Sequence, residues 1–275
     1  MSELKKIEGK TFLITGGASG LGAGYAQAFL ENGAKSVAIL DISEDAGKAT
    51  AKRLNKIFPN KVLFFKCDVG NEESLTQAFN EVVDKFKTVD VIINNAGVMN
   101  DSPNMFRKCC DINYKGLVSL TFKGLEHMHK EDGGVGGTIV NISSTAAFGR
   151  FPYVPAYSGS KAGVLHFSSC LAVDPFHEVT GVRIISMCIG PTKTPIFNNM
   201  DQLSYDERSG KAMAQLLSSL NYQRPESAVS GVVEAFKQGT NGSNWFSVND
   251  KPVKDITLAY NQAQDFLTKA LNSDL

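Results

Sequence analysis

Short apolar runs alternate along the chain with longer stretches of helical periodicity. The apolar runs lie near residues 10–15, 36–41, 61–66, 89–93, 138–142, 181–188 and 243–248. Strands that alternate with helices form βαβ units, and these units build parallel sheets. Continuously apolar strands are typical of a sheet covered on both faces. The pattern predicts an α/β fold, a doubly wound Rossmann-type parallel sheet of about seven strands with helices on both faces.

The stretches between these runs predict the helices. They span about 21–32, 43–57, 71–86, 106–128, 156–178, 211–220 and 225–239, and the tail after 250 is also helical. Ser43 is expected to cap its helix, and Pro175 to end or kink the helix from 156. Because we find no linker and no repeat, we expect one domain over 1–275, with a substrate lid at about 192–224 and a C-terminal tail at about 250–275.

Composition and charge exclude several function classes. Lys+Arg and Asp+Glu number 28 each, so no net charge attracts nucleic acid or acidic lipid. The N-terminus does not resemble a signal peptide, and no stretch approaches the ~18 apolar residues of a membrane span. The five cysteines fit neither a disulfide framework nor a metal site, which favours a reducing compartment. We therefore expect a cytoplasmic protein without nucleic-acid partner, integral membrane segment or metal.

A glycine-rich loop joins the first strand to the first helix. It reads Thr15-Gly16-Gly17-Ala18-Ser19-Gly20-Leu21-Gly22. In a strand–loop–helix unit the helix amides and dipole favour a bound pyrophosphate. Gly16 would allow the tight turn, and Gly20 and Gly22 would let the backbone approach the phosphate. A plain glycine turn is the alternative, but the position at the first strand-to-helix turn favours a dinucleotide site.

Asp41 ends the second strand, 19 residues beyond Gly22. A carboxylate at this place accepts hydrogen bonds from the adenosine ribose hydroxyls. The same charge repels a 2′-phosphate, and no Arg or Lys stands at Ser19 or directly after Asp41 to offset it. The sequence therefore predicts NAD rather than NADP as cofactor.

Four later segments extend the pattern. The glycine spacing is Thr-Gly-x-x-x-Gly-x-Gly, and it is followed by Cys67-Asp68-Val69, Asn94-Asn95-Ala96-Gly97, Asn141-Ile142-Ser143-Ser144 and Tyr157-Ser158-Gly159-Ser160-Lys161. With these segments in this order between residues 11 and 195, the chain resembles the short-chain dehydrogenase/reductase family. The resemblance implies a single dinucleotide-binding fold that oxidises an alcohol or reduces a carbonyl.

Tyr157 and Lys161 are four residues apart, so they share one face of a helix. A lysine ammonium beside a phenol stabilises the phenolate, so we expect it to lower the tyrosine pKa toward working pH. Ser144 ends an adjacent strand, where open α/β sheets bind ligands, and its hydroxyl can hold the substrate oxygen. By resemblance, Asn113 is the fourth catalytic residue and holds a water that links Lys161 to solvent.

The resemblance also implies the cofactor contacts. Lys161 would bind the nicotinamide ribose, and Thr194 would contact the carboxamide. The family usually has Pro-Gly after the sixth strand, whereas this chain has Gly190-Pro191, so the backbone path there can differ. The expected cofactor-binding residues are Gly16, Ser19, Gly20, Leu21, Gly22, Asp41, Ile42, Asp68, Val69, Asn95, Ala96, Gly97, Tyr157, Lys161, Gly190, Thr192 and Thr194.

The segments Lys193-Thr194-Pro195 and Asn241–Trp245 resemble the insect alcohol dehydrogenase-like branch, near 15-hydroxyprostaglandin dehydrogenase. Apolar residues of the lid either face an apolar ligand or pack the lid onto the body: Ile196, Phe197, Met200, Leu203, Met213, Leu216 and Leu217. Phe148, Phe151 and Tyr153 lie between Ser144 and Tyr157, so we expect them beside the reacting carbon, where they suggest a hydrophobic substrate. By analogy with the branch, we expect an apolar alcohol such as a retinol or an isoprenoid alcohol.

Two alternatives remain. The first is an NADPH-dependent carbonyl reductase on the same fold, which the charge of Asp41 disfavours. The second is a non-catalytic family member that only binds the cofactor, which the intact set of catalytic residues disfavours. The family also implies a homodimer through its long helices at about 104–128 and 156–178.

Overall fold

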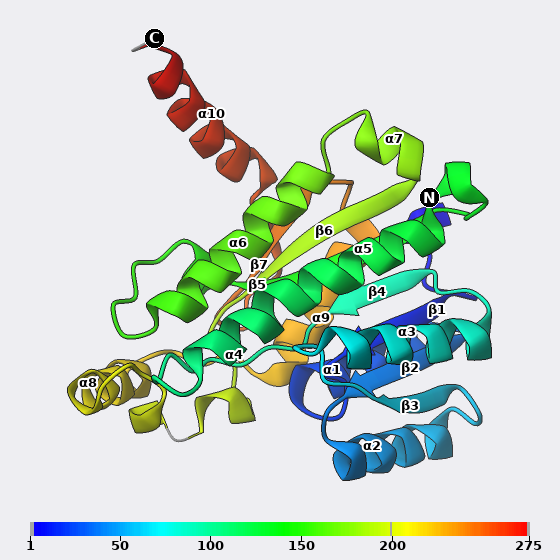
Figure 1. Cartoon of the computed structure of the whole chain (residues 1–275), viewed down its shortest axis with the longest axis horizontal. Helices are drawn as coiled ribbons and strands as arrows, with labels where there is room; N and C mark the ends of the chain where they lie inside the picture. The colour runs from blue at the N-terminus through cyan, green and yellow to red at the C-terminus, as the bar shows by residue number, and fades with distance from the viewer. Residues whose placement is uncertain (1–2, 199, 274–275) are drawn as a thin grey trace.

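The computed structural model describes residues 3–198 and 200–273 and contains one mainly parallel sheet (Figure 1). Its strands are β1 (Thr11–Thr15), β2 (Ser36–Asp41), β3 (Val62–Lys66), β4 (Val91–Asn94), β5 (Gly137–Ser144), β6 (Val182–Ile189), β7 (Ser243–Ser247) and β8 (Lys254–Asp255). Strands β1 to β7 pair in parallel, which confirms the predicted sheet. The short exposed strand β8 is an addition that pairs antiparallel with β7.

The strand order is β3-β2-β1-β4-β5-β6-β7-β8, and it reverses between β1 and β4. The chain runs outward from β1 to β3, then crosses back to the other side of β1 and continues to β7. Thr15, Asp41 and Asn94 end their strands at the same edge of the sheet. In open α/β sheets this reversal opens a ligand-binding crevice at the carboxyl ends of the strands.

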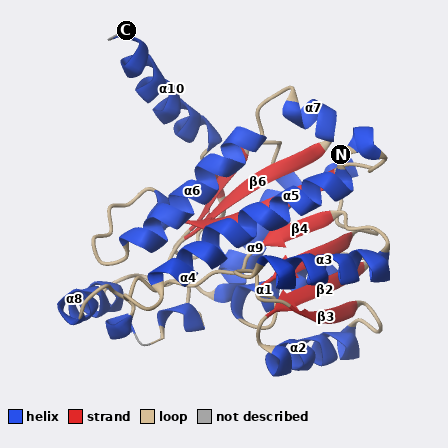
Figure 2. Ribbon diagram, viewed as in Figure 1, coloured by secondary structure: helices blue, strands red, loops and turns tan. Residues whose placement is uncertain are grey.

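Helices cover both faces of the sheet (Figure 2). They are α1 (Gly20–Glu31), α2 (Glu44–Ile57), α3 (Glu72–Phe86), α4 (Phe106–Cys110), α5 (Leu117–Met128), α6 (Pro155–Leu171), α7 (Phe176–Thr180), α8 (Glu207–Ser218), α9 (Pro225–Gln238) and α10 (Thr257–Ser273). Helices α1, α2 and α9 bury their apolar stripes against one face, and α3 and α5 against the other. Both faces are therefore dry, which explains why the strands are apolar throughout.

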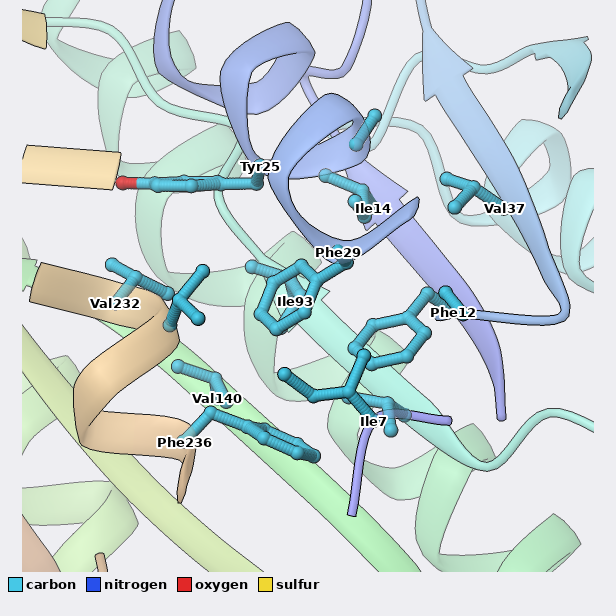
Figure 3. Close-up of a cluster of buried hydrophobic side chains, with 14 of the residues drawn as sticks. Ile7, Phe12, Ile14, Tyr25, Phe29, Val37, Ile93, Val140, Val232 and Phe236 are labelled. Atoms are coloured by element: carbon cyan, nitrogen blue, oxygen red, sulfur yellow. The ribbon is translucent and has the colours of Figure 1, made fainter. Parts of the chain in front are cut away.

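Strand β1 supplies both layers of the core. Phe12 points to the face under α1 and α9, whereas its neighbour Leu13 points to the opposite face. The ring of Phe12 stacks on that of Phe29, with centroids 4.4 Å apart, and Phe236 of α9 closes the group (Figure 3). Such aromatic pairs contribute about 0.5–1.5 kcal/mol beyond area burial. This packing holds the C-terminal half of α1 against the sheet.

The helix predicted over 106–128 is interrupted. Helix α4 leads into a π-helical segment, Asp111–Gly116, and only then into α5. A Cβ on Gly116 would lie 2.3 Å from the carbonyl oxygen of Val69, so this segment packs directly against the loop after β3. A π-helical turn inside an α-helix frequently marks a functional site, and here it carries Asn113.

The helix predicted over 156–178 is divided as well. Helix α6 ends at Leu171, and α7 starts at Phe176, directly after Pro175. Pro175 therefore interrupts the helix as predicted, because proline lacks the amide hydrogen that a helix interior needs. Ser43 precedes α2, but its side chain makes no capping hydrogen bond, so that expectation is wrong.

The C-terminal tail is helical, as predicted, and α10 extends away from the body of the molecule (Figure 1). Within residues 3–198 and 200–273, no helix is long and apolar enough to cross a membrane. The same residues contain no group of three or more His, Cys, Asp and Glu side chains that could hold a metal. All five cysteines are free thiols.

Candidate active site

At two positions of the glycine-rich loop, Gly16 and Gly22, neighbouring backbone comes so close that a side chain would not fit. Gly16 has a φ of +64°, which favours glycine, and a Cβ on Gly22 would lie 2.1 Å from the carbonyl oxygen of Gly16. Ser19 precedes α1, and its side chain makes no capping bond. The first amides of α1 therefore face the crevice without a side-chain cap, an arrangement suited to a phosphate.

Asp41 holds the loop from the neighbouring strand. One carboxylate oxygen accepts from the amide of Ala18 at 3.0 Å, and the other accepts from the amide of Ser43 at 2.9 Å. On the other side, Asn95 donates to the carbonyl of Thr15 at 2.8 Å. The loop is thus fixed by residues from the ends of β2 and β4, which keeps the crevice open between them.

A cleft of about 720 Å³ lies over the carboxyl ends of the strands. It has apolar walls, with the carboxylates of Asp41 and Asp68 at one end. Lys108 also lines it and lies 3.8 Å from the Asp68 carboxylate. The predicted cofactor residues that line this cleft are Gly16, Ser19, Gly20, Leu21, Gly22, Asp41, Ile42, Asp68, Val69, Asn95, Ala96, Gly97 and Thr194.

A second, smaller cavity of about 150 Å³ is lined by three of the four predicted catalytic residues. Ser144 at the end of β5 and Tyr157 and Lys161 on α6 all line it, as do the cofactor candidates Gly190 and Thr192. Leu21, Asn95, Gly97 and Thr194 also line this cavity, so the two spaces share a wall. The structure therefore brings the predicted cofactor and catalytic residues together.

Helix α6 is tied to β5 by Lys161, the predicted catalytic lysine. The Lys161 ammonium donates to the carbonyl of Ile142 at 2.9 Å and lies 6.0 Å from the centre of the Tyr157 ring. The hydroxyl of Ser143 donates to the carbonyl of Lys161 at 2.8 Å. These bonds place Tyr157 opposite Ser144, whose hydroxyl accepts from the amide of Ala146 at 3.1 Å.

Burial controls the ionisation of this pair. It raises the pKa of Tyr157 above its usual value, and a hydrogen bond with Ser144 opposes the rise. Burial also lowers the pKa of Lys161 to about 8. The expectation that the ammonium lowers the pKa of Tyr157 is wrong for the chain by itself. Burial is the largest influence on the phenol, and the ammonium donates to the Ile142 carbonyl instead.

Asn113 is fully buried in the π-helical segment and reaches the same region. Its side-chain oxygen accepts from the amide of Val98, and its nitrogen donates to the carbonyl of Val98, both at 2.8 Å. A Cβ on Gly97 would lie 3.3 Å from this oxygen and 3.4 Å from the Lys161 ammonium. A side chain at position 97 would therefore crowd both Asn113 and Lys161, and these groups would have to shift by a few tenths of an ångström to admit it.

The aromatic residues before Tyr157 separate. Phe151 lines the catalytic cavity, whereas Phe148 packs on Phe246 and Tyr260 with ring centroids 5.1 and 6.3 Å apart. Tyr153 packs beside the lid and does not line the cavity. The expectation that all three lie beside the reacting carbon is therefore wrong for Phe148 and Tyr153.

The lid residues also divide between two roles. Ile196, Phe197, Met213 and Leu217 line the catalytic cavity, and Leu203 lines the larger cleft. Leu216 lines neither space, and the side chain of Met200 lies outside the described residues. Met213 and Leu217 pack within the lid and also line the catalytic cavity. The lid residues therefore serve both purposes that the sequence left open: they pack the lid onto the body and they can face an apolar ligand.

Sequence reasoning missed Gln223, which organises the Gly190-Pro191 segment. Its fully buried amide donates to the Thr192 hydroxyl at 3.0 Å and to the carbonyl of Ser247 at 2.9 Å. The Thr192 hydroxyl in turn donates to the carbonyl of Gly190 at 2.8 Å. These residues are far apart in sequence, so no local pattern could have indicated the contact.

Asp101 is a second residue that sequence reasoning missed. It follows the Asn95–Gly97 segment, and its buried carboxylate accepts from the amides of Ala156 and Tyr157. Helix α6 therefore receives its cap from a loop 55 residues away.

The site combines a crevice, a glycine loop and the group Ser144, Tyr157 and Lys161. These features define a dinucleotide-dependent oxidoreductase of the short-chain type. Residues 10–203 match the family described as short chain dehydrogenase, and the chain belongs to that family. It is 37% identical to 15-hydroxyprostaglandin dehydrogenase [NAD(+)] of Bos taurus over 206 residues, which cover 74% of this chain and 75% of the relative.

Two further comparisons cover more of the chain. It is 32% identical to alcohol dehydrogenase 1 of Ceratitis capitata over 243 residues, 88% of this chain and 92% of the relative. Among solved structures, levodione reductase superposes with a TM-score of 0.74 at 25% identity, covering 87% of this chain and 96% of that one. The resemblance to this family, drawn from the motifs, is confirmed.

Proposed function

We propose that this protein is an NAD-dependent dehydrogenase that oxidises an uncharged, largely apolar alcohol to the aldehyde or ketone. One observation carries the proposal: Ser144, Tyr157 and Lys161 line a single cavity that shares a wall with the cleft over the glycine loop. The NAD-dependent 15-hydroxyprostaglandin dehydrogenases and the insect alcohol dehydrogenases among its relatives support the same reaction class.

The cleft fits a dinucleotide. A Cβ on Gly16 would lie 2.9 Å from the Cα of Ala96, so the turn leaves only enough room for glycine beside the phosphate position. The amides at the start of α1 would hold the pyrophosphate, and Asp41 would accept from the adenosine ribose. The carboxylate of Asp41 repels a 2′-phosphate, which supports NAD over NADP. The carbonyl-reductase alternative with NADPH is therefore disfavoured.

Each predicted catalytic residue has its own part in the proton transfer. Bound NAD+ supplies the hydride acceptor and a positive charge that favours the Tyr157 phenolate. Tyr157 accepts the hydroxyl proton of the alcohol while Ser144 holds its oxygen, and the carbonyl forms as hydride leaves the carbon. The proton then passes toward Lys161. Since the Asn113 side chain is engaged with Val98, the relay water would sit on the backbone carbonyl of Asn113.

The lining of the cavity supports an apolar substrate. Among the described residues that line it, Lys161 is the only charged one, and the lining includes Met99, Phe151, Val154 and residues of the lid. A volume of about 150 Å³ holds only the carbinol end of a long alcohol. We propose that a retinol or isoprenoid alcohol enters with this end first, while the rest of its chain passes under the lid at 192–224.

The test is NADH formation from a panel of retinols, isoprenoid alcohols, prostaglandins and short secondary alcohols. We expect turnover with NAD+ and apolar alcohols, and much slower turnover with alcohols that carry a carboxylate near the carbinol. Tyr157→Phe is the control, because it keeps the ring and removes the proton acceptor. Unchanged turnover in this variant, or faster turnover with NADP+, would contradict the proposal. Binding of NAD+ without turnover of any alcohol would favour the non-catalytic alternative.

We further propose a homodimer through the face of α5 and α6, located in the cytoplasm. Phe122 on α5 is 52% exposed and contacts Phe167 of α6 edge to face, with ring centroids 5.7 Å apart. Tyr114 extends the same apolar face. Light scattering should give twice the mass of the chain, and Phe122→Asp should give the mass of one chain. The five free thiols support a reducing compartment.

A further inference from the structure

The first turn of α6 has backbone amides that receive no capping hydrogen bond from the residue before the helix. Val154 precedes the helix and has a hydrocarbon side chain, so it cannot accept from the first amides. Pro155 has no amide hydrogen, and the amide of Ser158 already donates to the carbonyl of Val154 at 3.0 Å. Two amides of the first turn are left over, those of Ala156 and Tyr157.

Asp101 satisfies both of them. Its carboxylate oxygens accept from Ala156 at 2.5 Å and from Tyr157 at 3.0 Å. The side chain is only 4% exposed, and within the described chain it forms no ion pair. Burial raises the pKa of this carboxyl, and the two amides oppose the rise. The carboxylate is thus solvated by the start of the catalytic helix and its dipole alone.

Asp101 also connects the catalytic helix to the lid. Its own amide donates to the carbonyl of Leu203 at 2.7 Å, and Leu203 lines the cofactor cleft. Asp101 itself lines neither the cleft nor the catalytic cavity. A serine or aspartate in place of Val154 would cap the helix locally, but it would not join these segments. The remote cap fixes α6 relative to the lid and to the loop after β4.

We infer that Asp101 is a positioning residue for hydride transfer, which sets the place of the Tyr157 phenol by holding the Tyr157 amide and couples it to the lid at Leu203. This inference rests on the proposed dehydrogenase function. The alignment of reacting groups is demanding, and a displacement of about 1 Å can slow a reaction on the order of 10²-fold. Loss of both hydrogen bonds should therefore reduce the rate of the chemical step without affecting cofactor binding.

The experiment compares Asp101→Ala and Asp101→Asn with wild type by stopped-flow measurement of a single turnover. We expect the rate constant of NADH formation to fall on the order of 10²-fold in Asp101→Ala. It should fall less in Asp101→Asn, which keeps one acceptor. The dissociation constant of NAD+ should stay within about twofold, since Asp101 does not line the cleft. A variant that merely folds poorly would lose amplitude, not rate constant.

Asp90→Ala is the matched control. Its partly buried carboxylate also accepts from a backbone amide, that of Thr11 at 2.8 Å, but at the opposite edge of the sheet, where it lies 3.6 Å from the Lys10 ammonium. It should lose stability with an unchanged rate constant. Hydrogen exchange of peptides covering 153–165 supplies a readout without turnover. We expect faster exchange of the first turn of α6 in Asp101→Ala but not in Asp90→Ala.

The outcomes separate the two proposals. A wild-type protein that forms no NADH overturns the proposed function, while the exchange measurement still shows whether Asp101 holds Tyr157 in place. An active wild type with an Asp101→Ala rate constant within about threefold of its own overturns the inference, as does unchanged exchange in that variant.

Discussion

The Lys161 ammonium lies 6.0 Å from the centre of the Tyr157 ring and donates to the carbonyl of Ile142 at 2.9 Å. Both side chains are almost completely buried, and burial raises the pKa of Tyr157 while it lowers the pKa of Lys161 to about 8. In the chain by itself, Lys161 therefore loses its proton at a lower pH than Tyr157 does.

The lowered pKa of Lys161 in the Tyr157–Lys161 pair predicts the pH dependence of the reaction. Alcohol oxidation requires the pair to have lost a proton, so its rate should rise with pH through the region near the Lys161 pKa of about 8. Carbonyl reduction requires the proton and should fall over the same range. Initial rates in both directions at saturating cofactor provide the measurement. An oxidation rate that is flat between about pH 6 and 9 would contradict this assignment.

Ser144→Ala should slow turnover on the order of 10²- to 10³-fold with little change in NAD+ affinity, because the hydroxyl interacts with the reacting oxygen and with Tyr157. Ser158→Ala is the control, on α6 next to Tyr157. The Ser158 hydroxyl is buried and has no hydrogen-bond partner within the described part of the chain, so its removal should leave kcat unchanged. Equal kcat values for the two variants would remove Ser144 from the mechanism.

Much of this site was predictable from sequence because its parts are local. The glycine loop, Asp41, and the spacing of Tyr157 and Lys161 follow from strand ends and helix periodicity. Asp101 and Gln223 escaped prediction because their partners lie 55 and 31 residues away. The pKa of Tyr157 was mispredicted because the sequence shows the neighbouring charge but not the depth of burial.

The elements of the fold, too, were predictable where they depend on local sequence and were missed where they depend on other contacts. Seven strands and most helices follow from periodicity, since buried strands and amphipathic helices have distinct patterns. The π-helical segment Asp111–Gly116 does not, because it depends on the approach of Gly116 to the Val69 carbonyl. The start of α8 was also missed: Asp206 begins it by accepting from the amide of Ser209 at 2.7 Å, inside a stretch of uniformly polar residues.

Asp41→Ala should relax cofactor preference. The substitution removes the repulsion of a 2′-phosphate, and it also removes the acceptor for the amides of Ala18 and Ser43. We therefore expect NAD+ affinity to fall about tenfold, while NADP+ affinity stays equal or improves. Titration by quenching of intrinsic fluorescence measures both. Asp45→Ala makes the same change in net charge on exposed α2 and should alter neither affinity; an Asp41→Ala variant with undiminished preference for NAD+ would refute the assignment.

Two glycines should respond in opposite ways to alanine. A Cβ on Gly22 would lie 2.1 Å from the Gly16 carbonyl oxygen, so Gly22→Ala should abolish NAD+ binding by displacing the loop. Gly159 is exposed within α6, and its added Cβ would meet no atom within 4 Å. Gly159→Ala should therefore stabilise the fold by about 0.5–1 kcal/mol with full activity. Urea unfolding and NAD+ titration of both variants provide the measurements. A Gly159→Ala variant less stable than wild type would contradict the prediction and show that another group covers this face of α6.

Burial of the Lys161 ammonium should also lower the free energy of unfolding near neutral pH. Its pKa is lowered to about 8 in the folded protein, whereas an unfolded lysine has a pKa near 10.4. Between these values the unfolded state binds more protons, so stability rises with pH over this window, and below about 8 the full penalty applies. Lys161→Met should therefore stabilise the protein near neutral pH by about 1–3 kcal/mol while abolishing activity. Urea unfolding at neutral and alkaline pH provides the measurement, and the advantage of the variant should shrink as the pH rises toward 10.4. A variant that is less stable than wild type at neutral pH would show that the bond to the Ile142 carbonyl outweighs the desolvation of the charge.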